Sequence, residues 1–152
     1  MKNNVNLMKI VIILIPLIAG LLINYSSFIQ GIYFRLWWVF ILVFILFWFW
    51  GGKFFAEYAR DKIVAFLLAN SLWGISFILF IWQFVIVDGA NRNLGFALIS
   101  QLYMMLLLPL VSRMMSIFSN TMSSTNLISI SYIFMIFIFS LGFFYNDLRN
   151  KV

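Results

Sequence analysis

The sequence lacks cysteine and histidine altogether, and acidic residues are scarce. These absences exclude disulfides, thiolate nucleophiles, Cys/His metal sites and histidine-based acid–base catalysis. The four acidic residues, Glu57, Asp61, Asp88 and Asp147, form no cluster of three along the chain. Membrane hydrolases and transferases need a placed nucleophile with its base, or a group of carboxylates. We therefore expect a protein that is not an enzyme and that binds no metal or other cofactor.

Charged residues of both signs make up only 9% of the 152 residues, whereas 65% are hydrophobic. A water-soluble domain of this length could not bury so much apolar surface. The formal net charge of +6 comes from lysines and arginines scattered between apolar runs, which disfavours nucleic-acid binding. The composition therefore predicts a single-domain membrane protein whose main partner is the lipid bilayer.

The clearest membrane span is the charge-free stretch between Lys62 and Asp88. As a helix rising about 1.5 Å per residue, it is longer than the ~30 Å hydrocarbon core of a bilayer. Two apolar runs precede this stretch and two follow it. We therefore predict an all-α bundle of five transmembrane helices in one domain. The expected spans are residues 8–24, 33–55, 63–87, 94–118 and 127–145.

Tryptophans mark both ends of the second expected span. Trp37 and Trp38 lie near its beginning, and Trp48 and Trp50 lie near its end. The two pairs are separated by roughly 20 Å of helix, which is the spacing of two interfacial aromatic belts. We interpret them as interface anchors, with a tryptophan-lined ligand pocket as the alternative.

The connection at residues 51–62 carries five of the fourteen charged residues. Glu57 and Asp61 have helical i, i+4 spacing, so both carboxylates lie on one face with basic residues around them. Such a pair can hold a divalent ion when a third acidic residue completes it. Because no third ligand is nearby, we predict a solvated cluster beside the membrane.

The central span contains a polar notch formed by Asn70 and Gly74, beside Trp73 and Phe77. An amide without partners in hydrocarbon costs several kcal/mol by transfer estimates. We therefore expect Asn70 to be buried in protein, bonded to another helix or to a ligand. A bond to a carbonyl of its own helix is the alternative. Gly74 removes side-chain bulk where a neighbouring helix or a flat ligand could approach.

The fourth expected span carries a polar stripe. Gln101 and Ser112 lie close to one face, and Pro109 is expected to kink the helix between them. Polar side chains in a membrane helix normally face protein, so Gln101, like Asn24 of the first span, is an expected partner for Asn70. The candidate ligand-binding residues are Asn70, Trp73, Gly74, Phe77, Gln101 and Ser112.

Two short motifs in residues 65–132 resemble the tryptophan-rich sensory protein, or translocator protein, family. Asn70-Ser-Leu-Trp73-Gly-Ile-Ser-Phe77 is similar to that family's N-x-x-W and following aromatic residue in its third helix. The stretch that ends at Tyr132 resembles the approach to the fifth helix, where Ser131 replaces the family's usual proline. The family's tryptophan- and proline-rich loop after the first helix is absent, since residues 25–36 contain no proline.

The resemblance implies a non-enzymatic homodimer that binds porphyrins, sterols or similar flat apolar ligands. In that case Asn70 and Trp73 would face the ligand pocket. Two other functions remain open from the residues alone. One is an accessory, assembly or immunity subunit that packs against another membrane protein. The other is a small transporter, although coupled transporters usually need a buried acid and none lies within an expected span.

The positive charges predict the orientation of the chain in the membrane. A five-span chain with its N-terminus in the cytoplasm has six lysines and arginines inside and four outside. We therefore predict a multi-pass protein of the cell membrane with a cytoplasmic N-terminus and an external C-terminus. The inner set is Lys2, Lys9, Lys53, Arg60, Lys62 and Arg113, and the outer set is Arg35, Arg92, Arg149 and Lys151.

Overall fold

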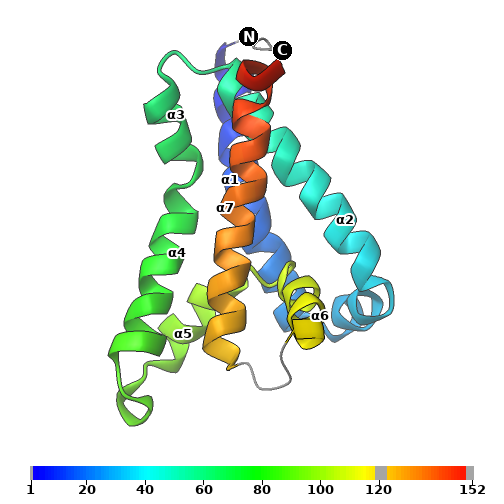
Figure 1. Cartoon of the computed structure of the whole chain (residues 1–152), viewed down its shortest axis with the longest axis vertical. Helices are drawn as coiled ribbons and strands as arrows, with labels where there is room; N and C mark the ends of the chain where they lie inside the picture. Colours follow the sequence, from blue (N-terminus) through cyan, green and yellow to red (C-terminus); the bar gives the residue numbers. More distant parts are fainter. Residues whose placement is uncertain (1, 119–122, 150–152) are drawn as a thin grey trace.

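The computed structural model describes residues 2–118 and 123–149, and within these ranges every regular element is a helix (Figure 1). Three helical segments are long and apolar enough to cross a membrane, and a bent pair of helices is a fourth candidate. The all-α membrane class is therefore confirmed, whereas the count of five spans is not. The three segments are Asn4–Tyr25, Ile29–Glu57 and Ser124–Tyr145.

The first two helices, α1 (Lys2–Tyr25) and α2 (Ser27–Glu57), are joined by Ser26 alone. The Ser26 hydroxyl caps α2 by accepting a hydrogen bond from the Ile29 backbone N–H (3.3 Å). The expected turn at residues 25–32 is therefore mostly helical. The Ser26 hydroxyl satisfies a helix start instead of belonging to a loop, and α2 bends later, at Leu36.

The central stretch forms α3 (Lys62–Ala69) and α4 (Ser71–Ile81), followed by the π-helical turn η1 (Trp82–Ile86). Asp61 caps the start of α3. Its carboxylate accepts hydrogen bonds from the backbone N–H groups of Ile63 (2.9 Å) and Val64 (3.2 Å). The chain then breaks at Asn70, and the two halves are bent by 52°. The expected straight span at residues 63–87 is thus a bent pair.

The expected continuous helix at residues 94–118 is interrupted. The short 3-10 turn η2 (Gly89–Asn91) leads into α5 (Leu94–Leu102), and five residues, 103–107, separate α5 from α6 (Leu108–Phe118). Pro109 explains the interruption, because within a helix it could not donate to the Met105 carbonyl and its ring would clash there. At the start of α6 this cost disappears, and the Tyr33 hydroxyl donates to the Met105 carbonyl instead (3.3 Å).

Together α5 and α6 form a hairpin whose turn, residues 103–107, lies inside the bundle. Tyr103 and Leu107 are almost fully buried, and the Tyr103 hydroxyl donates to the Ile13 carbonyl in the middle of α1 (3.2 Å). Both open ends of the hairpin lie at the same end of the molecule (Figure 1). The hairpin therefore enters the bundle and returns, and it does not cross it.

Because the hairpin returns, the first helix begins and the last helix ends at the same end of the molecule. The start of α1, the α2–α3 connection and the end of α7 (Ser124–Arg149) lie at one end, which we call the terminus end (Figure 1). The α1–α2 connection, η2 and the end of α6 lie at the opposite end, which we call the hairpin end. The chain between the two termini thus crosses the length of the bundle an even number of times.

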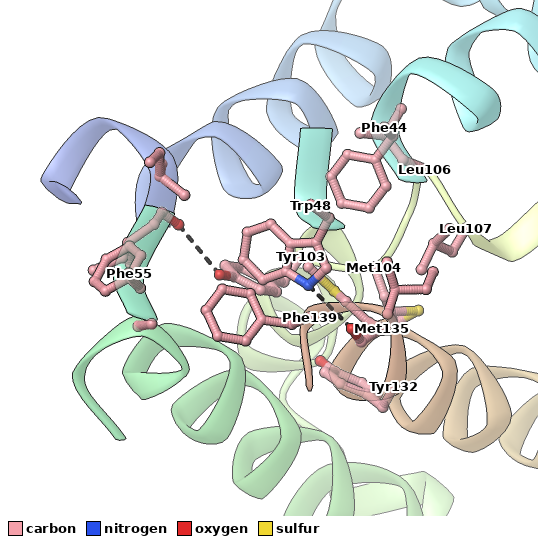
Figure 2. Packing of buried hydrophobic residues seen from close by; sticks show 14 of the residues in the cluster. Phe44, Trp48, Phe55, Tyr103, Met104, Leu106, Leu107, Tyr132, Met135 and Phe139 are labelled. Atoms are coloured by element: carbon pink, nitrogen blue, oxygen red, sulfur yellow. Dashed lines mark hydrogen bonds between the residues drawn. The ribbon is translucent and has the colours of Figure 1, made fainter. Parts of the chain in front are cut away.

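The most extensive packing in the bundle joins α2 and α7. A Cβ atom at Gly52 would overlap the Phe139 carbonyl, and one at Gly142 would overlap the Phe49 carbonyl, so only glycine permits this approach. The Trp48 indole N–H donates to the Met135 carbonyl of α7 (3.0 Å; Figure 2). Trp48 is fully buried, so its expected role as an interface anchor is wrong.

Candidate functional site

Trp73 and Phe77 lie together, as their spacing in the sequence suggests. Their rings stack with centroids 5.3 Å apart, and both rings contact Tyr132 of α7. The Trp73 indole N–H donates to the Tyr132 backbone carbonyl (3.1 Å). The pair therefore attaches α4 to α7, and its polar atom already has a protein partner.

Asn70 is buried, as expected, with 7% of its surface exposed. Its side-chain N–H donates to the Phe66 carbonyl of its own helix (2.9 Å), so the alternative expectation applies and the expected bonds to Asn24 or Gln101 do not form. Within the described ranges its side-chain oxygen has no hydrogen-bond partner. The Asn70 amide thus lies at the break between α3 and α4 and, among the described residues, forms no hydrogen bond to another membrane-spanning segment.

The other candidate residues are dispersed. A side chain at Gly74 would meet no atom within 4 Å, so no neighbour approaches the helix there. Gln101 is half-buried on α5, and Ser112 is exposed on α6 beside a hollow of about 260 Å³. No pocket described in the structure brings the six candidates together, and ligand binding by them stays a prediction.

A buried polar cluster joins α4, α5 and α7. The Ser76 hydroxyl donates to the Ser100 carbonyl (3.0 Å), and the Tyr132 hydroxyl donates to the same carbonyl. The Ser100 hydroxyl donates to Ala97 of its own helix (2.7 Å). Analysis of the sequence missed the Ser76–Ser100 contact, because two serines on separate helices carry no signal of pairing. The cluster is internally satisfied and leaves no polar group for a ligand.

A second polar cluster closes the connection between η1 and α5. The fully buried Gln83 accepts the Asn93 backbone N–H with its side-chain oxygen (2.9 Å). The Arg92 side chain donates to the Gln83 backbone carbonyl (2.8 Å), and its guanidinium lies 4.3 Å from the centre of the Phe84 ring. This arrangement holds the turn in one shape and is structural.

The largest hollow described in the structure, of about 780 Å³, lies at the terminus end, between α1 and α3. Its walls come from four parts of the fold: the first turns of α1, the end of α2, the α2–α3 connection and α3. We call it the α1–α3 groove. It is lined by Asn6, Lys9, Ile10, Phe55, Ala59, Arg60, Asp61, Val64, Ala65 and Leu68.

The mouth of the α1–α3 groove is charged. The Lys9 ammonium donates to the Tyr58 backbone carbonyl (2.9 Å) and lies 5.7 Å from the centre of the Phe55 ring. Arg60 is exposed, and no other described residue forms a hydrogen bond or ion pair with its guanidinium. Asp61 is occupied in capping α3. The mouth therefore presents two cations beside one capping carboxylate, whereas the adjoining wall is apolar.

The expected solvated cluster at residues 51–62 is thus divided. Its glycines continue α2, whereas Arg60 and Asp61 line the groove. No group of three acidic side chains that could hold a metal ion occurs in the part of the chain that the structure describes. The groove could not be predicted from the sequence, because Lys9 and Arg60 are far apart along the chain.

Comparison of the chain with known protein families, with curated proteins and with solved structures found no match. The resemblance to the translocator protein family stays a prediction. The fold itself defines the class: an all-helical protein with three membrane-spanning candidates, or four if the bent α3–α4 pair is one span.

Proposed function

We propose that this protein is a non-enzymatic integral membrane protein that binds an amphipathic small molecule in the α1–α3 groove. The observation that carries the proposal is the groove itself, which joins a cationic mouth to an apolar wall. Its volume of about 780 Å³ falls within the range usual for small-molecule sites. A purely apolar ligand would leave the cations unused, and a small soluble ion would leave the wall empty.

The distribution of basic residues supports an orientation for the site. Because the α5–α6 hairpin returns to its starting side, Arg113 joins Arg35 and Arg92 at the hairpin end, whereas six basic residues lie at the terminus end. Cytoplasmic sides of membrane proteins carry the excess of lysine and arginine. We propose a protein of the cell membrane whose terminus end, including the end of α7, is cytoplasmic. The six are Lys2, Lys9, Lys53, Arg60, Lys62 and Arg149.

A second candidate function is that of a subunit packing against another membrane protein or a second copy of this chain. It is favoured by a shallow apolar hollow of about 450 Å³ on the outer face of α2, where Trp37 and Trp38 lie beside Leu110 of α6. A helix from a partner could fill this hollow with side chains. Annular lipid could fill it equally well, so we place this function second.

Filling the groove tests the main proposal. Leu68 lines the groove and is half exposed, so Leu68→Trp should occupy the site without entering the core. Ile75→Trp is the matched control, because Ile75 is also half exposed but lies outside the groove. Each variant is purified in mild detergent, and native mass spectrometry counts the small molecules that remain bound.

We expect the wild-type protein and Ile75→Trp to retain about one amphipathic molecule per chain, and Leu68→Trp to lose it. A porphyrin or sterol retained by all three proteins would place the site elsewhere, as the family resemblance implies. Retention of a second protein chain without any small molecule would favour the subunit function. Either result would overturn the proposal for the groove.

A further inference from the structure

We infer that the molecule held in the α1–α3 groove is an anionic phospholipid, with its phosphate between Lys9 and Arg60 and an acyl chain along the wall. This inference rests on the proposed function and names its ligand. It is argued from the depth of the charges, the donors that remain available, and the exposure of the apolar wall.

The depth of the charges matches the polar boundary of a lipid leaflet. Lys9 is the last charge before a long apolar run in α1, and Arg60 lies just before the charge-free stretch that begins at Ile63. The wall residues Val64 and Leu68 lie one and two turns farther into the apolar zone. A charged head and an apolar tail are therefore matched in the order in which a phospholipid presents them.

The donors at the mouth suit a phosphate diester. An ammonium has three N–H donors, and Lys9 uses one of them for the Tyr58 carbonyl (2.9 Å). Arg60 offers a planar set of donors that no other described residue occupies. Arginine and lysine bind phosphate oxygens through charge-assisted hydrogen bonds. The Asp61 carboxylate keeps its negative charge while it caps α3, and Lys9 and Arg60 outweigh it, so the three groups leave a formal charge of +1 toward the ligand.

The wall favours a ligand that arrives from the membrane. Ile10, Val64 and Leu68 are about half exposed although they line the groove, so the apolar side is open to lipid chains. A free phosphate in water would bind the cations without covering this surface. A phosphatidylcholine would bring its own positive charge beside Lys9 and Arg60, whereas phosphatidylglycerol would not. Net charge therefore selects an anionic head.

The test uses the full-length protein in nanodiscs of phosphatidylcholine and phosphatidylglycerol in equal amounts. After transfer to detergent, native mass spectrometry measures which lipid stays bound to the protein. We expect phosphatidylglycerol to be enriched among the retained lipids. Since one basic residue at a membrane surface contributes a factor of about five in affinity for anionic lipid, Arg60→Gln should reduce the enrichment about fivefold.

Lys9→Gln should have a similar effect, and circular dichroism will check its fold because it also removes the bond to Tyr58. Arg60 makes no such internal bond with a described residue, so Arg60→Gln tests the charge alone. The matched control is Arg113→Gln, which removes an exposed cation at the hairpin end and should leave the enrichment unchanged.

The outcomes separate this inference from the proposed function. Lipid that is displaced by Leu68→Trp but shows no head-group preference would overturn the inference that the groove selects an anionic phospholipid. The groove would remain a binding site. A sterol or other neutral amphiphile displaced by Leu68→Trp would do the same. Inorganic phosphate that displaces the lipid at equal concentration would reduce the site to an anion site. Lipid unaffected by Leu68→Trp would overturn both.

Discussion

The α2–α7 pair and α3 are all rich in apolar residues, yet they are attached to the bundle in different ways. Between α2 and α7, Gly52 and Gly142 bring the backbones into contact, and the Trp48 indole bonds across the gap. In α3, Ala69 alone is buried, and Ile63 is 74% exposed. Hydropathy therefore predicts that all three helices lie in the membrane. Small residues and indole donors decide which of them pack closely, and we call the closely packed α2–α7 pair the scaffold.

The functional consequence follows from the same contrast. Where the backbones of α2 and α7 touch at Gly52 and Gly142, no space remains for a ligand. The α3 helix contacts α7 through Phe66, which lies against Phe139 and Phe143, while its opposite side leaves the α1–α3 groove open. The scaffold thus holds the position of the groove, and the loosely attached helix forms its wall.

The largest expected effect comes from adding one methyl group to the scaffold. Gly142→Ala places a Cβ against the Phe49 carbonyl, and we expect a loss of about 1–3 kcal/mol in the free energy of unfolding. Gly74→Ala is the control, because a Cβ there meets no atom within 4 Å and alanine favours helix. Denaturation in mixed detergent measures both. Equal losses at the two positions would contradict close α2–α7 packing.

A smaller effect is expected from removing indole donors on the two sides of α7. Trp48→Phe loses the bond to Met135 and leaves a gap in a fully buried site, so we expect about 2 kcal/mol of destabilisation. Trp73→Phe loses the bond to Tyr132 at a less buried site, and we expect about 1 kcal/mol. The same unfolding measurement ranks them, and the reverse order would weaken the contrast between scaffold and wall.

The smallest change in stability is expected at the bend of the α3–α4 pair. The Asn70 side chain donates to the Phe66 carbonyl (2.9 Å) that also accepts the Asn70 backbone N–H (3.1 Å), and such competition disfavours a regular helix. Asn70→Leu removes both this donor and the unpartnered oxygen. We expect the unfolding free energy to change by less than about 1 kcal/mol, while the 52° bend decreases.

Spin labels at the exposed positions Leu7 of α1 and Ile63 of α3 measure this change as a distance across the groove. Asn70→Leu should shift the distance distribution. Ser71→Ala is the control, because Ser71 also donates to a backbone carbonyl of α3 but is exposed. An unchanged distribution in Asn70→Leu would show that packing, and not the amide, sets the bend.

Part of this fold could be predicted from the sequence because membrane helices are long, apolar and free of charge. The break between the spans expected at residues 63–87 and 94–118 was predicted on those grounds, and the burial of Asn70 from the cost of an amide in hydrocarbon; the structure confirms both. The hairpin was not predicted, since hydropathy cannot distinguish an apolar run that crosses from one that turns back. Pro109 carried the relevant signal, but it indicates a kink and a helix start equally well.

The candidate site was harder to predict, for a different physical reason. Asn70 and Trp73 stand out because polar and aromatic groups are unusual in a span, yet the structure gives their donors protein partners. Lys9 and Arg60 do not stand out, because charges beside a membrane are common. The joint role that we propose for them depends on α1 and α3 meeting at one end of the bundle, which neither sequence segment encodes alone.

Synthesis of the chain delivers α1 and α2 to the membrane well before residues 94–118 emerge. The turn of the α5–α6 hairpin needs the Tyr33 hydroxyl from α2 for its Met105 carbonyl, and Tyr103 needs the Ile13 carbonyl of α1. Exposed to lipid alone, the Met105 backbone carbonyl and the Tyr103 hydroxyl would lack these partners, at a cost of several kcal/mol. We therefore expect the hairpin to form late in biogenesis, after the first two helices have assembled to receive it.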